Sequence, residues 1–328
     1  MRRLEGALTL RAVGLRALRR AALPGLLFLF CANLAAAVSI SRTNYHGWSG
    51  CYILSNDAAE VVIVPQIGRV MQFRFAGEEE GPFWENRAMD GKSPIPTSKE
   101  WGNFGGDKTW PAPQDDWPKV TPRGWPPPVA FDSMPVDVTV EGSNLRLVSA
   151  VDPHYGIRTQ RIISLDDSEP KMTIRTVYQK IEGDPRKVGV WIITQLSEPD
   201  FVVIPTSMGD QYIRQSETAP QNLKVGKHAI TLKRNPSKSA KIGTDASSLY
   251  WVGPKTALRI DSPRAEGEYP DNGCSAEVYT NPNPLTYVEL EMLGPLRTMK
   301  PGDTLAQVNT YTLLRRAELG PEITADVK

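Results

Sequence analysis

The sequence is poor in histidine and cysteine, and it shows no sustained helical period. Only three histidines and three cysteines occur among 328 residues, and no Cys/His cluster has zinc spacing, which argues against a structural metal site. No pattern repeats with a period of about 20–50 residues, which argues against a propeller or a solenoid. We therefore expect no metal and no cofactor, and we expect any chemistry to rest on carboxylate, lysine and aromatic side chains.

The charge of the chain is concentrated at its start. Residues 1–20 carry six arginines and one acid, and an uncharged, mostly apolar run follows as far as Ala37. This order is typical of an export signal, so we expect residues 1–37 to be a signal peptide that is cleaved after Ala37. A retained membrane anchor is the alternative, although Pro24, Gly25 and Asn33 disfavour a spanning helix.

Cleavage would change the formal charge from +1 to −4, because six arginines and one acid leave with the signal. This balance argues against a nucleic-acid partner and against contact with an anionic membrane after cleavage. We expect a periplasmic or extracellular protein. Cys51 and Cys274 remain in the mature chain. An oxidising compartment would allow a disulfide between them, and two buried thiols are the alternative.

Short β-rich runs separated by turn residues fill the mature chain. Many alternate apolar and polar residues with a period of two, as half-buried strands do. With abundant proline and glycine, this pattern predicts an all-β protein, an antiparallel sandwich or barrel, as a single domain over residues 38–328. The expected strands are 51–54, 61–64, 70–75, 136–140, 145–148, 157–164, 172–178, 188–194, 201–204, 229–232, 248–252, 257–260, 286–293 and 307–314.

The stretch 101–132 is unlike the rest of the chain. It contains four of the eight tryptophans, seven prolines and four glycines. Proline and glycine disfavour a long helix, and the aromatic content is too high for a disordered linker. We therefore expect a long irregular loop that packs on the remaining structure and contributes to function.

Three motifs resemble those of a known family. The segment Gly105–Gln114 (GGDKTWPAPQ) resembles the core motif of the family called domain of unknown function 4380. Val64–Met71 resembles an early turn of that family, and Tyr287–Leu296, followed by Lys300–Asp303, resembles its late strand. The resemblance covers roughly residues 45–315. The family is in turn similar to the galactose mutarotase superfamily. The resemblance implies an antiparallel β-supersandwich with a sugar-binding cleft on the concave sheet.

The late strand supplies the first candidate catalytic group. Side chains alternate along a strand, so Tyr287, Glu289 and Glu291 share one face. The resemblance implies that Glu289 is the late carboxylate that mutarotases use in acid–base catalysis. A solvated strand face is the alternative. The paired histidines of true mutarotases are missing from this sequence, which weakens the case for that reaction.

Two further residues complete the candidate catalytic group. His154 lies in a turn before the strand 157–164, where it is either an acid–base partner or a solvated turn histidine. Lys108 is either an electrostatic stabiliser of developing oxyanion charge or a salt-bridge partner of Glu289 or another acid.

The candidate sugar-binding residues surround the central motif. Aromatic faces suit the C–H side of a sugar ring, and fixed polar groups orient its hydroxyls. A core position is the alternative for each tryptophan. The candidates are Trp110, Gln114, Asp107, Trp117, Arg69, Glu291 and Tyr287.

These observations favour an exported protein that binds or modifies carbohydrate in a mutarotase-like cleft. If the protein is an enzyme, we expect an isomerase of the aldose epimerase type. A non-catalytic binding or scaffold module of the cell envelope is the alternative. A hydrolase or lyase is a third reading, which two carboxylates facing one cleft would favour.

Overall fold

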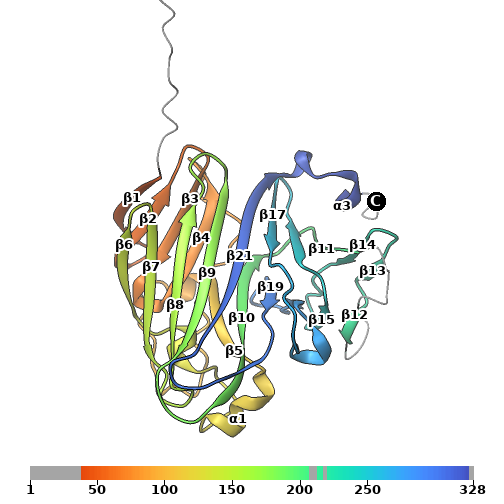
Figure 1. Ribbon diagram of the computed structural model, residues 1–328. Coiled ribbons are helices and arrows are strands. Elements are labelled where there is room, and N and C mark those ends of the chain that lie inside the picture. Colours follow the sequence, from red (N-terminus) through yellow and green to blue (C-terminus); the bar gives the residue numbers. More distant parts are fainter. Residues whose placement is uncertain (1–37, 207–212, 217–219, 325–328) are drawn as a thin grey trace, which may run out of the picture. The chain divides into compact units, whose positions relative to one another are not determined.

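The computed structural model describes residues 38–206, 213–216 and 220–324 (Figure 1). The expected signal peptide, residues 1–37, lies outside the described residues. Within the described ranges, no helix has the length and apolar character needed to cross a membrane.

The described residues form two antiparallel sheets, and the larger contains eleven strands. Strands β1 to β5 follow one another in its order, and β10 joins them to β19, β18, β15 and β12, while β20 pairs with one end of β10. Its strands are β1 (Ser39–Tyr45), β2 (Trp48–Ser55), β3 (Ala59–Val64), β4 (Arg69–Phe75), β5 (Asp107–Ala112), β10 (Arg186–Ser197), β12 (Ile213–Ser216), β15 (Ala240–Thr244), β18 (Ala276–Thr280), β19 (Tyr287–Leu293) and β20 (Arg297–Met299).

The second sheet contains ten strands of the described chain, in the order β13-β14-β11-β16-β17-β21-β9-β8-β7-β6. Figure 1 shows the long strand β21 running beside β9 and then beside β17, so that it joins the two halves of this sheet. Its strands are β6 (Val136–Glu141), β7 (Asn144–Val151), β8 (Ile157–Leu165), β9 (Lys171–Lys180), β11 (Phe201–Pro205), β13 (Leu223–Val225), β14 (Ala229–Leu232), β16 (Ser248–Val252), β17 (Thr256–Asp261) and β21 (Thr304–Arg315). The α-helices are four residues each: α1 (Trp117–Val120), α2 (Val129–Asp132) and α3 (Pro321–Thr324).

The main hydrophobic core contains side chains from both sheets. Strand β19 contributes Val288, Leu290 and Met292, while β8 contributes Ile163. The opposite face of β19 carries Tyr287, Glu289 and Glu291, as the alternation of side chains predicts. All seven residues of β19 are nevertheless buried. Other residues of the chain therefore surround the face of β19 that points away from the core, and its two carboxylates are largely shielded from solvent. The predicted all-β, antiparallel fold is confirmed.

A buried charge on β5 links the two sheets. The Asp107 carboxylate pairs with Arg161 on β8 and accepts hydrogen bonds from the hydroxyls of Thr194 (2.6 Å) and Tyr311 (2.6 Å). Asp107 and Arg161 are 0% and 4% exposed. Because protein groups supply all of these partners, the charge of Asp107 has a structural role and holds the two sheets together.

Strand β5 lies inside the stretch that the sequence predicts to be irregular. It pairs with β10 over six residues, and only its first residue pairs with β4. Beyond Asp107 one edge of β5 carries no ladder, which is where a proline such as Pro111 is tolerated in a sheet. The prediction of a long loop is therefore wrong for Asp107–Ala112, because the pairing with β10 overrides the local composition.

The two cysteines of the described chain are buried thiols. Cys51 lies on β2 and Cys274 precedes β18, and no disulfide joins them. The alternative of two buried thiols is the one that the structure bears out.

We expect the Asp107→Asn variant to lose about 3 kcal/mol or more of unfolding free energy, because Arg161 would stay buried without its counter-charge. Urea unfolding followed by tryptophan fluorescence measures the loss. The matched control is Glu169→Gln, which removes an exposed ion pair with Lys171 and should unfold near the wild-type midpoint. Equal midpoints for both variants would contradict the structural role of Asp107.

Candidate functional site

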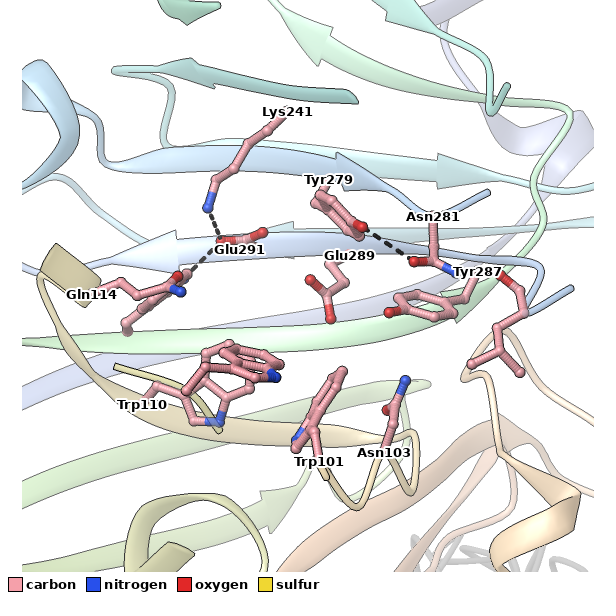
Figure 2. A pocket seen from close by; sticks show the side chains of 13 residues that line it. Trp101, Asn103, Trp110, Gln114, Lys241, Tyr279, Asn281, Tyr287, Glu289 and Glu291 are labelled. Carbon is pink, nitrogen blue, oxygen red and sulfur yellow. Dashed lines mark hydrogen bonds and ion pairs between the residues drawn. The ribbon is translucent and has the colours of Figure 1, made fainter. Parts of the chain in front are cut away.

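A pocket of about 510 Å³ lies on the face of the larger sheet that points away from the core (Figure 2). Its volume falls in the range of about 300–1,000 Å³ that is usual for small-ligand sites. Strand β19 forms its floor, and the stretch 101–125, which includes β5, forms one wall. Figure 2 shows Lys241, Tyr279 and Asn281 on the opposite side.

Tryptophans form the first wall of the pocket. Trp101, Trp110 and Trp125 all line it, and their rings meet edge to face at centroid distances of 5.3 to 6.0 Å. Trp125 is the most accessible of the three, at 45% exposed. Such a wall offers a broad apolar surface to a ligand and leaves polar recognition to the floor.

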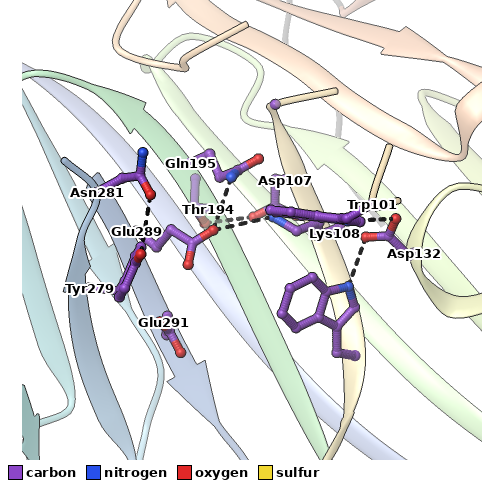
Figure 3. A network of polar contacts seen from close by, with 12 residues as sticks. Trp101, Asp107, Lys108, Asp132, Thr194, Gln195, Tyr279, Asn281, Glu289 and Glu291 are labelled. Carbon is purple, nitrogen blue, oxygen red and sulfur yellow. Dashed lines mark hydrogen bonds and ion pairs between the residues drawn. The ribbon is translucent and has the colours of Figure 1, made fainter. Parts of the chain in front are cut away.

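Asp132 of α2 fixes two of these rings. Its carboxylate accepts hydrogen bonds from the indole N–H groups of Trp110 (2.8 Å) and Trp101 (3.2 Å), and Figure 3 shows Trp101 beside it. The guanidinium of Arg69 pairs with the same carboxylate at 2.9 Å and donates to the carbonyl oxygen of Gly105. The two ends of the tryptophan-rich stretch are thus tied together at one buried carboxylate.

Trp117 supports this wall from behind. It is 0% exposed, and its N–H donates to the carbonyl oxygen of Pro111 at 2.8 Å. Its ring lies 5.5 Å from that of Trp110 and 6.4 Å from that of Trp191. Trp117 is therefore a core residue, as the alternative reading of the sequence has it.

Glu289 lies at the centre of the pocket floor. Its carboxylate accepts a hydrogen bond from the Gln195 amide at 2.9 Å and lies 3.7 Å from the ammonium of Lys108 (Figure 3). Burial raises the pKa of Glu289 to about 7, although Lys108 acts against the rise. The carboxyl group can therefore give or take a proton near neutral pH.

Lys108 lies behind Glu289, away from solvent. Its side chain is 0% exposed, and the ammonium lies 5.2 Å from the Trp110 ring and 5.6 Å from the Trp101 ring. Within the described residues, the ammonium has no hydrogen-bond partner. Burial lowers the pKa of Lys108 to about 8, with Glu289 opposing the change. Lys108 thus forms an ion pair with Glu289, the partner that its salt-bridge reading names, and does not itself line the pocket.

A second charged group lies at the other end of the floor. Glu291 accepts hydrogen bonds from the Trp191 indole (2.8 Å) and from Lys241 (3.0 Å), and Lys241 also pairs with Glu277 at 2.7 Å. Burial acts against the charge of Lys241, but Glu291 and Glu277 raise its pKa above the ordinary value. The pocket thus carries two carboxylates on one strand in different surroundings.

The structure brings together five of the predicted residues. Trp110, Gln114, Tyr287, Glu289 and Glu291 line the pocket.

Lys108 and Trp117 lie directly behind the lining. Arg69 is buried further back at Asp132, and Asp107 points into the core between the sheets.

His154 is not part of the pocket. It is exposed in the turn between β7 and β8, where its backbone N–H donates to the Asp152 carboxylate at 2.9 Å. The turn belongs to the second sheet, so proximity to the strand 157–164 does not bring His154 to Glu289. None of the chain's three histidines, all of which are described, lines this pocket.

Other pocket residues were not predicted. Trp101 and Trp125 belong to the tryptophan-rich stretch, so its composition was a usable signal. Lys241 and Tyr279 lie on β15 and β18, two short strands that are absent from the expected strands. The remaining unpredicted residues are Asn103, Trp191, Asn281 and Leu285. Among the described residues, no group of three or more His, Cys, Asp and Glu is placed to hold a metal ion.

Solved structures of mutarotase-like proteins share this fold. A provisionally named aldose 1-epimerase from Escherichia coli K12 is 12% identical, with a TM-score of 0.54 over 84% of this chain and 100% of that chain. A galactose mutarotase related enzyme from Lactobacillus acidophilus is 11% identical, with a TM-score of 0.52 over 80% and 97%. A galactose mutarotase-like protein from Clostridium acetobutylicum is 9% identical, with a TM-score of 0.51 over 85% and 99%.

At these identities the likeness shows the fold, which is galactose mutarotase-like. No protein-family model matches the chain, and a comparison with curated protein sequences gives no match.

We expect the Glu289→Gln variant to lose less stability than the wild type as pH rises from 5 to 7. The folded pKa of about 7 exceeds the ordinary 4.5, so between these values the folded state binds more protons and stability falls with rising pH. The slope is at most about 1.4 kcal/mol per pH unit. Loss of Glu289 also removes the charge that holds up the pKa of Lys108, so that pKa falls further. The folded variant then binds fewer protons near pH 7, which also makes its stability fall less with rising pH.

Urea unfolding at pH 5, 6 and 7 measures these slopes. The control variant Glu268→Gln, which alters an exposed carboxylate paired with Lys187, should keep the wild-type slope. A slope for Glu289→Gln that equals the control slope would show that Glu289 does not titrate in this window.

Proposed function

We propose that the pocket binds a sugar and that Glu289 carries out acid–base chemistry on it, as in an aldose epimerase. One observation carries the proposal: a carboxyl group with a pKa near 7 lies on the floor of a sugar-sized pocket walled by tryptophan. The mutarotase-like fold supports it.

We also propose that the protein is exported, because of the basic and apolar start of the chain. N-terminal sequencing of the mature protein checks this.

The reaction needs two proton transfers. Opening a sugar ring requires that the anomeric hydroxyl lose a proton and that the ring oxygen gain one. As a carboxylate, Glu289 takes the first proton, and the nearby ammonium of Lys108 favours the carboxylate form. The Lys241 ammonium, paired with Glu291 at the other end of the floor, is the group that donates a proton to the ring oxygen on opening and recovers it on closure. After the C1–C2 bond of the open-chain aldehyde has rotated, the protonated carboxyl group of Glu289 returns its proton to the C1 oxygen as the ring closes.

Binding relies on the walls of the pocket. Trp101 and Trp125 can cover the C–H face of a sugar ring, while amide groups of Gln114, Asn281 and Asn103 orient its hydroxyls. The Oδ1 atom of Asn103 has no hydrogen-bond partner among the described residues, so a small rotation would offer it to a ligand. Apolar contact and a few fixed polar groups are the usual composition of a sugar site.

We further propose membership in the family called domain of unknown function 4380. The segment Gly105–Gln114 that resembles its core motif builds β5, places Lys108 behind Glu289 and puts Trp110 and Gln114 in the pocket. The motif thus coincides with the chemistry of the site. Aligned homologues in which Lys108 and Glu289 vary independently would count against a shared site.

Non-catalytic binding is the second candidate function. The position of the histidines favours it, because no histidine reaches the pocket that holds Glu289. A binding module would use the tryptophan wall and leave Glu289 as a hydrogen-bonding group. The two candidates differ in turnover and share the same ligand pocket.

We expect the wild type to accelerate mutarotation of an aldose and Glu289→Gln to lose about 100-fold or more of that rate, as removal of an acid–base group does. Polarimetry on a panel of aldoses, with calorimetric binding in parallel, measures both properties. Glu268→Gln serves as control and should keep the full rate. Binding by the wild type without any rate acceleration would establish the binding module instead.

We expect Trp101→Ala to weaken sugar binding about tenfold, because the variant loses an aromatic face worth on the order of 1 kcal/mol. The matched control is Phe75→Ala, which removes a half-buried aromatic ring that also lies under a cation, Arg315, outside the pocket. Isothermal titration calorimetry measures both affinities. Equal sugar affinity of the two variants would show that the tryptophan wall does not contribute to sugar binding.

A further inference from the structure

A second pocket, of about 480 Å³, lies on the same face of the larger sheet. The first pocket is lined from β5, β10, β15, β18 and β19, whereas the second is lined around Gln72 of β4 and Ser197 of β10. Tyr45, Trp84 and Glu85 complete its centre. Its volume also falls within the range of about 300–1,000 Å³ that is usual for small-ligand sites.

The two pockets lie on the same face of the sheet. A row of neighbouring side chains, from Glu289 to Gln72, crosses the strands on this face. Glu289 is opposite Gln195 in the register and bonded to it, and the backbone N–H of Trp84 donates to the Gln195 carbonyl at 2.9 Å. Phe83 lies in the core, so Trp84 points the other way, and the Gln72 amide donates to the Phe83 carbonyl at 3.3 Å. Three strand steps separate Glu289 from Gln72, about 14 Å.

An aromatic pair lies between the pockets. The rings of Trp84, in the second pocket, and Tyr287, in the first, lie 4.6 Å apart. Figure 2 shows Tyr287 and Asn103 together at one end of the first pocket. A ligand that leaves the first pocket at this end therefore passes over an aromatic surface that suits a sugar ring.

A buried carboxylate anchors the second pocket. The side chain of Glu85 is 8% exposed and accepts hydrogen bonds from the Tyr45 hydroxyl (2.5 Å) and the Gln72 amide (3.2 Å). His46 and Arg87 each lie 3.4 Å from its other oxygen. The groups around this carboxylate all belong to the pocket lining, as a polar binding site requires.

The second pocket has an excess of negative charge. Glu79 and Glu80 are exposed in its lining, and Arg87 is the opposing permanent charge there. Burial raises the pKa of the Glu85 carboxyl, so the negative excess rests on Glu79 and Glu80. Burial, and then Arg87, lower the pKa of His46, so this histidine is neutral near pH 7 and does not offset the carboxylates. Uronate or sulfated sugars would be repelled here, whereas neutral or amino sugars would be accepted.

We propose that the two pockets are adjacent subsites of one cleft, and that the ligand is an oligosaccharide whose second unit is a neutral or amino sugar. The proposal rests on the proposed sugar-binding function of the first pocket. The line from Glu289 to Gln72 gives the ligand its direction, across the strands and over Trp84.

A glycan array with neutral, amino and acidic mono- to tetrasaccharides tests the proposal on the mature chain. Calorimetry then compares the tetrasaccharide that binds best with its terminal monosaccharide. We expect the tetrasaccharide to bind at least about tenfold tighter. Glu85→Gln should weaken tetrasaccharide binding about tenfold, as loss of a charged hydrogen-bonding group does, and leave monosaccharide binding unchanged. Trp101→Ala should weaken binding of both ligands, and Glu268→Gln, which alters an exposed carboxylate paired with Lys187, should weaken neither.

The outcomes separate the subsite from the function. Unchanged monosaccharide binding by Glu85→Gln also shows that this variant is folded. Equal affinity for mono- and tetrasaccharide in the wild type, or unaltered tetrasaccharide binding by Glu85→Gln, would overturn the second subsite and leave the sugar function standing. Preference for acidic tetrasaccharides would overturn the assigned chemistry of the second unit. Binding of no glycan at all would overturn the proposed function and the subsite together.

Discussion

Strand β5 carries a buried charge on each of its two faces, and both the fold and the site depend on this arrangement. Asp107 points between the sheets, where Arg161, Thr194 and Tyr311 satisfy it. Lys108, the next residue, points the other way to Glu289. Neighbouring residues of a strand face opposite sides, so one dipeptide joins the sheets and sets the electrostatics of the pocket. A shift of register by one residue would place each charge among the wrong partners.

Asp132 holds the pocket wall in relation to that strand. Its carboxylate binds the indoles of Trp101 and Trp110 and the guanidinium of Arg69, so residues about 30 and 60 positions apart meet at one point. Indole rings held at both the ring face and the N–H have little freedom to turn. The wall is therefore pre-formed, which lowers the entropy that a ligand would lose on binding.

The sequence predicts the pocket floor better than its walls. Period-two alternation on 286–293 places Glu289 and Glu291 on one face of β19, and the structure bears out that face. Alternation could also have separated Asp107 from Lys108, had the stretch around them been read as a strand. Its prolines and glycines hid β5, because only the pairing with β10 makes the strand. Lys241 could not be found, since its position depends on which strands become neighbours. The prediction that His154 lies near Glu289 was wrong for the same reason. The sequence of a turn beside a predicted strand does not show to which sheet that strand belongs.

The cost of the buried charges is itself an argument about function. Desolvation of Lys108 and Glu289 offsets much of their attraction, and well-packed apolar residues in such positions usually give equal or greater stability. The pair spans 3.7 Å and leaves the ammonium without a hydrogen bond, so its geometry is not optimised for stability. In the Arg69–Asp132 pair of the same region, by contrast, each guanidinium nitrogen has a hydrogen-bond partner. An unsatisfied ammonium beside a carboxyl group that titrates near neutrality is what a proton-transfer site requires and what a purely structural ion pair would avoid.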